Sequence, residues 1–233
     1  MSVRVGINIV LLACSIPLVA VGVIWYLTTL PPSWYQPLAG DDPVVMRAGE
    51  LGEMQLVEAF QLIREPNELW RIRIDEAVVN AWIAARLPDW MEGQFEARFP
   101  ESVNQPQLNF VPDEIQLATW FGNTDSPSCV VAGFEPEVRD GELFLRVSSV
   151  GLGRISIPGD PMARVIKYLR SAIPEAELDQ EMADQAIATM QGQQGFSSIV
   201  PLFDGRHVLI RDVVVEDGSL LLTAETQIGE LSD

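Results

Sequence analysis

The sequence is short of the residues from which most catalytic and metal sites are built. Its 233 residues include one histidine, one lysine and two cysteines. Zinc sites draw three or four ligands mainly from Cys and His. Because Cys14 lies in an apolar N-terminal run, too few ligands are left for such a site. The single histidine, His207, stands beside Val208, Leu209 and Ile210 at an expected strand start. That position favours a structural role over that of a general base.

The two cysteines also exclude a structural disulfide. Cys14 belongs to the apolar run, whereas Cys129 belongs to the rest of the chain, so the two cannot be bridged across a membrane. The globular part therefore has to fold without a disulfide, even in an oxidising compartment. Apolar residues follow Cys129, in the order Val130, Val131 and Ala132. This context predicts a buried strand cysteine more readily than a reactive thiol.

The common catalytic and cofactor motifs are missing as well. The sequence contains neither a G-x-S-x-G nucleophile elbow nor a calcium-binding D-x-[DN]-x-[DN]-G loop. Gly151 and Gly153 fall within expected strands, not at the strand-to-helix turn that a dinucleotide motif needs. We therefore expect no enzyme activity, no cofactor and no metal. An enzyme that uses paired carboxylates is the least favoured alternative.

Positive charge is scarce. Asp and Glu number 33 against 15 Lys and Arg, which gives a formal net charge of −18. Such a surface repels nucleic acid and anionic lipid headgroups, so we expect no nucleic-acid partner. Hydrophobic residues make up 48% of the chain, which is typical of a globular protein and not of a disordered one.

A long run without charge opens the chain. No charged residue occurs from Val5 to Leu30, and a helix of that length rises roughly 39 Å, enough to cross a hydrocarbon core of ~30 Å. Trp25 and Tyr26 suit the headgroup zone at its end, and Pro31 ends the helix. Residues 1–30 are therefore predicted to be a transmembrane anchor.

The flanking charges predict which way this anchor is inserted. Arg4 precedes the run, whereas Asp41 and Asp42 follow it before any basic residue. The positive-inside rule then places the N-terminus in the cytoplasm of a bacterium. The C-terminal domain lies outside the inner membrane, on a single-pass anchor. Two alternatives are a signal peptide cleaved near residues 20–22 and a lipoprotein signal at residues 11–14, but the apolar run continues past both.

Beyond the anchor, composition and periodicity predict an α+β fold. Residues 31–48, rich in Pro and acid, are interpreted as a linker, and residues 49–233 as one extracytoplasmic domain. Alternating or apolar segments between turn residues predict strands, and i/i+4 apolar stripes predict helices. The domain is expected to be a curved antiparallel sheet packed with about three helices. The expected strands are residues 54–63 and 69–74, two strands between residues 106 and 121 on either side of a turn at Pro112-Asp113, and residues 128–134, 142–150, 206–215 and 219–227. The expected helices are residues 75–86, 160–169 and 174–191.

Two Asp-Gly pairs, Asp140-Gly141 and Asp217-Gly218, each lie between two segments in which apolar and polar residues alternate. Both residue types tolerate positive φ, so each pair predicts a β-hairpin. The segments around them echo one another: residues 138–145 match residues 215–222 at paired positions. Hairpin chemistry alone explains this echo, and a duplicated hairpin is the alternative.

Aromatic residues are the only candidates for a binding site. The ordinary interpretation is that they fill the core. The alternative is that they line an apolar groove between helix and sheet, which would suit a lipid chain because each buried methylene contributes ~0.8 kcal/mol. The candidate groove-lining residues are Trp82, Trp90, Phe95, Trp120 and Phe121.

One stretch resembles a known family. The run GFEPEVRDGEL at residues 133–143 continues through VSSVGLG at residues 147–153 to Ile157-Pro158. Together with Asp75-Glu76 and Asn80 in the preceding helix, it resembles the YpmS-like family of membrane-anchored bacterial envelope proteins. The resemblance covers about residues 70–170. It departs in the long helix expected after Pro174 and in its Gln-rich end.

The resemblance implies an extracytoplasmic lipid-binding or lipid-carrying domain with a curved sheet wrapped around a helix, and it supplies no catalytic residues. We therefore expect a membrane-anchored binding module, with lipid or another apolar molecule as its ligand. The alternative is a non-catalytic scaffold or interaction subunit of a cell-envelope complex, with an envelope protein as its partner.

Overall fold

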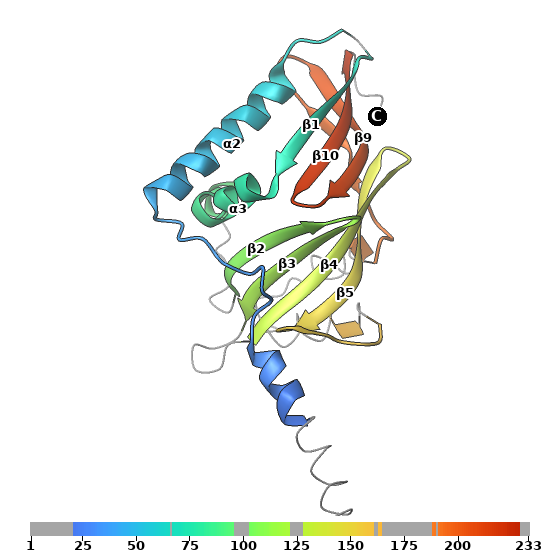
Figure 1. Ribbon diagram of the computed structural model, residues 1–233. Helices are drawn as coiled ribbons and strands as arrows, with labels where there is room; N and C mark the ends of the chain where they lie inside the picture. Colours follow the sequence, from blue (N-terminus) through green and yellow to red (C-terminus); the bar gives the residue numbers. More distant parts are fainter. Residues whose placement is uncertain are drawn as a thin grey trace, which may run out of the picture.

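The fold is α+β, with two antiparallel sheets and helices on one side of them (Figure 1). The computed structural model describes residues 21–65, 67–95, 103–121, 128–160, 163–164, 188–189 and 191–228. Residues 21–29 are helical. The elements that follow are α2 (Pro43–Gln61), β1 (Leu69–Asp75), α3 (Glu76–Ala85), α4 (Leu87–Phe95), β2 (Val103–Val111), β3 (Glu114–Phe121), β4 (Ser128–Arg139), β5 (Glu142–Leu152), β6 (Ile155–Ser156), β7 (Phe196–Ser197), β8 (Ile199–Pro201), β9 (Arg206–Glu216) and β10 (Ser219–Ile228).

The strands divide between two sheets, whereas the sequence predicts one. The larger sheet has the order β2-β3-β4-β5-β6, with β7 also paired to β5, and the smaller has the order β1-β10-β9-β8. Strand β1 pairs with the last strand, β10, from Leu69 opposite Glu225 to Asp75 opposite Ser219. This pairing across most of the chain forms the second sheet, and no local pattern reveals it.

The prediction of a strand over residues 54–63 is wrong, because helix α2 covers most of this range. Asp42 caps the helix by accepting a hydrogen bond from the Val44 amide at 2.8 Å, and Pro43 occupies its first turn. Two glycines let α2 approach α3 closely: a Cβ on Gly49 would lie 3.1 Å from the Ala81 carbonyl oxygen, and one on Gly52 would lie 2.1 Å from a Val78 methyl carbon. Packing on α3 therefore favours the helix despite its glycines.

Helix α2 also begins inside the range 31–48 that the sequence assigns to a linker. The segment before it packs against β2. The Tyr35 hydroxyl donates to the Gln105 carbonyl oxygen at 2.7 Å, and the Gln36 amide donates to Gln107 Oε1 at 2.7 Å. The Tyr35 ring is buried in a cluster with Ala118 and Cys129. The segment is thus part of the domain's packing.

The other local predictions agree with the structure. The strand at residues 69–74 and the hairpin strands after residue 103 are present. At the predicted Asp-Gly turn between β4 and β5, Asp140 and Gly141 have φ of 52° and 79°, the signs that a type I′ turn requires. Asp75 stands at the N-cap of α3, but its side chain makes no capping hydrogen bond. The helices predicted at residues 160–169 and 174–191 lie largely outside the described residues.

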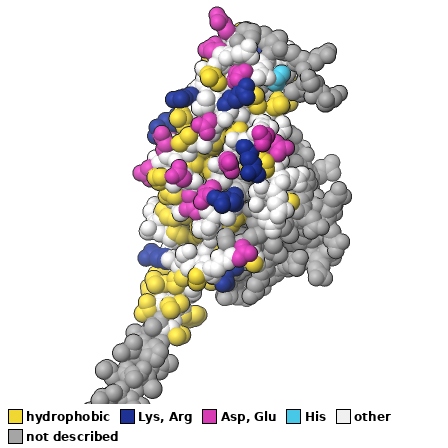
Figure 2. Space-filling view, turned by 90° about the vertical axis from the view of Figure 1, so that its right-hand side faces the viewer, with side chains coloured by type: hydrophobic (Ala, Val, Ile, Leu, Met, Phe, Trp, Pro, Cys, Tyr) yellow, Lys and Arg dark blue, Asp and Glu magenta, His cyan; other side chains and the backbone are white. Residues whose placement is uncertain are grey.

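Residues 21–29 project from the base of the domain, and most of their large apolar side chains are exposed (Figure 2). Figure 2 shows hydrophobic side chains gathered on this segment, while acidic and basic side chains lie on the body above it. Within the described part of the chain, no helix is long and apolar enough to span a bilayer. The exposed apolar residues include Val21, Val23, Ile24, Trp25 and Tyr26.

Helix α3 covers the free edge of strand β2, and this contact joins the helices to the larger sheet. The buried Asn80 carboxamide forms two hydrogen bonds with Leu108: Nδ2 donates to its carbonyl oxygen and Oδ1 accepts from its amide, both at 2.8 Å. One helical turn earlier, Glu76 Oε2 accepts from the Phe110 amide at 2.6 Å. Side chains at i and i+4 of α3 thus take the place of a further strand.

The smaller sheet attaches to the same edge. The turn between β9 and β10 brings the Gly218 amide to the Phe110 carbonyl oxygen at 3.0 Å, and the Asp113 amide donates to the Val215 carbonyl oxygen at 3.1 Å. Strand β2 is therefore the place where α3 and both sheets meet.

The Asn80 pairing gives a stability prediction. Replacing Asn80 by Ala leaves the Leu108 amide and carbonyl without partners at a buried edge, so we expect the free energy of unfolding to fall by about 2–4 kcal/mol. Urea unfolding of the full chain, followed by tryptophan fluorescence, measures the change. The control is Asn109→Ala, which removes only a half-buried bond to Gln116, with an expected loss of at most about 1 kcal/mol. Equal losses in the two variants would contradict this role of Asn80.

Candidate functional site

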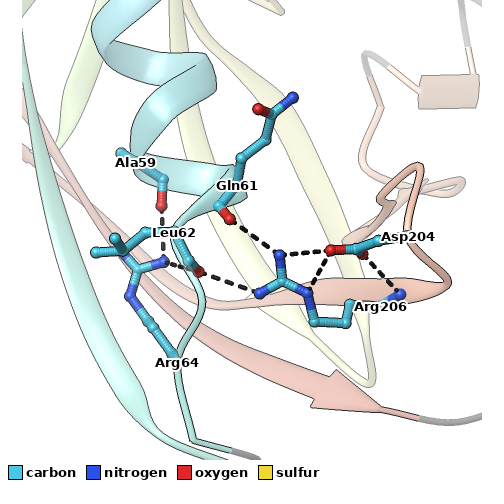
Figure 3. Close-up of polar contacts among 6 residues, drawn as sticks. All are labelled: Ala59, Gln61, Leu62, Arg64, Asp204 and Arg206. Atoms are coloured by element: carbon cyan, nitrogen blue, oxygen red, sulfur yellow. Dashed lines mark hydrogen bonds and ion pairs between the residues drawn. The ribbon is translucent and has the colours of Figure 1, made fainter.

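The end of helix α2 is held by two arginines from outside the helix (Figure 3). The last turn of α2 has no basic residue of its own, and the final carbonyls of a helix have no partners within it. Arg64 donates to the Ala59 carbonyl oxygen at 2.7 Å. Arg206 donates to the carbonyl oxygens of Gln61 at 2.9 Å and Leu62 at 3.1 Å. Both cations also face the negative end of the helix dipole.

Arg206 connects this helix end to the turn between β8 and β9. Its Nε lies 2.8 Å and its Nη2 lies 2.7 Å from Asp204 Oδ2, and its own amide donates to Asp204 Oδ1 at 3.2 Å. These hydrogen bonds hold the pKa of the Asp204 carboxyl below its ordinary value. The Arg206 side chain is only 10% exposed. Because it bonds to both segments at once, Arg206 fixes the turn against the end of α2.

The fixed turn displays a phenylalanine to solvent. Phe203 is fully exposed, and Ile63, on the neighbouring segment after α2, is 85% exposed. An apolar hollow of about 340 Å³ lies between α2 and the turn, and a second hollow of about 760 Å³ continues along α2. We call their combined lining the distal surface, because it lies at the end of the domain opposite residues 21–29 (Figure 1). It includes Glu50, Glu53, Met54, Leu56, Val57, Glu58, Phe60, Gln61, Leu62, Ile63, Arg86 and residues 200–203.

The charges on the distal surface are mostly acidic. Glu53 accepts from Trp82 Nε1 at 3.2 Å and from Arg86 Nε at 3.3 Å. Glu50 and Glu58 have no ion-pair partner among the described residues. The surface therefore combines an apolar floor with carboxylates that are free to meet a cation.

Of the five aromatic residues predicted to line a groove, the four whose side chains the structure describes do not form a single cluster. Trp82 on α3 and Trp90 on α4 form an edge-to-face pair with centroids 6.0 Å apart, near Glu53 at the border of the distal surface. Trp120 packs elsewhere, against Tyr35 beside strand β4. Phe121 is half-buried at the end of β3, and the Phe95 side chain lies outside the described residues.

The sequence reading missed the residues that form the distal surface. Phe203 stands in the segment Pro201-Leu-Phe-Asp-Gly205, where an aromatic residue occupies a turn that usually holds small polar residues. That mismatch is a signal of an exposed binding residue. Arg206 carries no such signal, because its targets are backbone carbonyls 144 and 145 residues away. The target of Arg64 at Ala59 is close in the sequence, but it is recognised only once α2 is known to end there.

A second polar cluster lies on the larger sheet. A β-bulge where β5 pairs with β4 lets Ser148 and Ser149 both reach Glu114 Oε1, at 2.6 and 2.7 Å. Gln116 donates to Glu114 Oε2 at 3.0 Å. A Cβ on Gly133 would lie 1.7 Å from Glu114 Oε1, so only glycine leaves room for this carboxylate. Burial raises the pKa of the Glu114 carboxyl, but the hydrogen bonds from Ser148, Ser149 and Gln116 outweigh it and keep this pKa below its ordinary value.

This arrangement suits a structural carboxylate, because its oxygens already accept three hydrogen bonds. Cys129 is fully buried, and burial raises the pKa of its thiol to about 11. A thiol in that state is a poor nucleophile. His207 is also buried, and its Nε2 lies 3.0 Å from Gln227 Oε1. These contacts agree with the structural roles that the sequence predicts for Cys129 and His207.

The Arg206 contacts predict how firmly the turn is held. In Arg206→Ala the carbonyls of Gln61 and Leu62 lose a charged donor, so we expect the free energy of unfolding to fall by about 1.5–3 kcal/mol. Hydrogen exchange should also quicken at the end of α2. The matched control is Arg73→Ala, whose partners Asp75 and Glu216 are exposed, with an expected loss below about 1 kcal/mol. A loss no larger than that of the control would show that Arg206 does not hold the turn.

The depressed pKa of Glu114 predicts a pH dependence. Its carboxylate stabilises the fold above the unfolded-state pKa of about 4.3, and this contribution is lost as the pH falls through the lower folded-state pKa. We expect Glu114→Gln to lower stability by roughly 1 kcal/mol at pH 7, because a charged acceptor becomes a neutral one. The difference should shrink below pH 4. Urea unfolding from pH 3 to 7 measures it, and the exposed Glu137→Gln should show no such dependence.

Comparison of the chain with protein-family models, curated proteins and solved structures finds no match. The function has to be argued from the distal surface, the projecting segment and the chemistry of their residues.

Proposed function

We propose that the chain is a membrane-anchored extracytoplasmic binding module of the YpmS-like kind, which offers its distal surface to an apolar ligand. The single observation that carries the proposal is the exposed apolar surface around Phe203, on a turn that Arg206 fixes to α2. Large exposed apolar areas that are bordered by polar residues commonly mark binding sites for proteins, membranes or ligands.

The projecting segment supports the membrane anchor. Val21, Val23, Ile24, Trp25 and Tyr26 are each more than half exposed, which is unfavourable in water because their apolar area stays hydrated. They continue the uncharged run that begins at Val5. A bilayer around this run would cover them, and Trp25 and Tyr26 would lie at its headgroup level.

The anchor segment is docked on the domain. The Arg154 amide donates to the Leu27 carbonyl oxygen at 3.0 Å, and Arg154 Nε donates to the Pro31 carbonyl oxygen at 2.9 Å. Gly153, with φ of 58°, lies so close that a Cβ would be 2.6 Å from the carbonyl oxygens of Leu27 and Leu30. The turn between β5 and β6 thus caps the end of residues 21–29, which supports a defined orientation of the domain on the membrane.

The lining of the distal surface supports an apolar ligand. The smaller hollow is bordered by Leu56, Val57, Phe60 and residues 200–203, and Gln61 is its only other lining residue. A lipid chain is one ligand of this chemistry. The scaffold function is the second candidate, and it is favoured by the position of the surface at the end opposite the anchor, where a neighbouring protein has access (Figure 1).

The anchor is tested by fractionation of cells that express the full chain. We expect the protein in the inner-membrane fraction, resistant to extraction at high salt, and digested by protease added to spheroplasts. A variant that lacks residues 1–30 should remain in the soluble cytoplasmic fraction, because it has lost the segment that inserts into the membrane. Recovery of the full chain as a soluble protein with a shortened N-terminus would overturn the anchor.

A further inference from the structure

The distal surface has the chemistry of a docking site for one class of partner. We propose that it binds a basic amphipathic segment of a partner protein, one that presents apolar side chains together with Lys or Arg. The inference rests on the proposed role of the distal surface in binding; it takes up the second candidate, the interaction subunit, and names the class of its protein partner.

The apolar part of the surface is held in place while uncovered. Phe203 is fully exposed, yet its turn is closed by hydrogen bonds from the Leu202 amide to the Arg206 carbonyl oxygen at 2.8 Å and from the Gly205 amide to the Leu202 carbonyl oxygen at 3.2 Å. Arg206 then fixes the turn to α2 (Figure 3). Because the backbone of this turn is already fixed, little backbone entropy is lost when a partner covers Phe203.

The shape of the apolar area fits a short helix or extended segment. Met54 and Val57, three residues apart on α2, lie on one side of the helix, and Ile63 follows where α2 has ended. From Met54 to Gln61 the helix rises roughly 10 Å, about two turns. Anchors spaced by three or four residues on a partner helix match such an area.

The free charges of the surface are negative. The arginine that lines the surface and the two that hold its turn are already engaged: Arg86 pairs with Glu53, Arg206 pairs with Asp204, and the Arg64 guanidinium lies 3.9 Å from the centre of the Trp70 ring. Glu50 and Glu58 have no ion-pair partner among the described residues. A basic partner would supply the missing opposite charge, which speeds association and selects the partner.

The same charges disfavour two other occupants. A second copy of this chain would bring a net charge of −18 against an equal charge, and an anionic bilayer would be repelled in the same way. The distal surface also lies at the end of the domain opposite the anchor segment (Figure 1). A basic segment of another protein is the occupant that satisfies both charge and position.

The experiment uses the full chain in nanodiscs of zwitterionic phosphatidylcholine. The probe is a fluorescent 18-residue peptide of leucine and lysine that forms an amphipathic helix, and its acidic counterpart of leucine and glutamate is the matched control. Fluorescence anisotropy measures binding, with empty nanodiscs subtracted. We expect the basic peptide to bind at least tenfold more tightly than the acidic one, with an affinity that falls as salt is added.

Variants locate the site. The exposed double substitution Phe203→Ser with Ile63→Ser should weaken binding of the basic peptide at least tenfold while leaving the unfolding midpoint unchanged. Glu50→Gln with Glu58→Gln should weaken it several-fold and flatten its salt dependence. Val44→Ser, at the other end of α2, and Glu137→Gln with Glu142→Gln should leave it unchanged, since all three residues are exposed and lie outside the distal surface.

Three outcomes overturn the partner class: equal binding of both peptides, no effect of the Phe203 and Ile63 substitutions, or no binding. Native mass spectrometry of the purified full chain separates this failure from that of the proposed function. If lipid is carried by the chain and lost in the Phe203→Ser, Ile63→Ser variant, the binding module stands with lipid as its ligand. If neither lipid nor basic peptide binds, the proposed function fails as well.

Discussion

The hydrogen bonds between helix α3 and the edge of strand β2 are the contact on which the rest of the structure depends. An open sheet edge leaves a row of unpaired amides and carbonyls, and here Asn80 and Glu76 occupy it. The β9–β10 turn joins the smaller sheet at Phe110 on the same strand. Helix α2 packs on α3, so the position of the distal surface follows from this edge. The interaction is polar, whereas the helix layer around it is held by close apolar packing.

The local parts of the fold are predictable because they depend on local chemistry. Asp140-Gly141 forms its hairpin because both residues adopt positive φ. Helix α2 is missed for the opposite reason: Gly49 and Gly52 weaken the helical signal, and only contact with α3 shows why they are small. The Asp42-Pro43 start carries the same signal as the predicted helix at Asp160, and it could have identified α2. The pairing of β1 with β10 joins residues about 150 positions apart, which no periodicity encodes.

The candidate site is less predictable than the fold. The sequence draws attention to tryptophans, but exposure is decided by tertiary position: Trp120 packs against Tyr35, while Phe203 is left uncovered. Asn80 is an intermediate case. The resemblance to an envelope family singles it out in the sequence, and the structure supplies its physical role at Leu108. A buried amide that replaces a strand tolerates few substitutions, because it must both donate and accept.

The hydrogen bonds of Arg154 to Leu27 and Pro31 join residues 21–29 to the domain. Each residue added to or removed from a continuous helix turns whatever follows by about 100° and shifts it by about 1.5 Å along the axis. The contacts of Arg154 with Leu27 and Pro31 would pass such a rotation of residues 21–29 to the turn between β5 and β6. The rotation of residues 21–29 about their own axis therefore sets the direction in which the domain, with Phe203 at its far end, faces. Under the proposed anchoring, this rotation would decide which neighbouring membrane protein lies opposite Phe203.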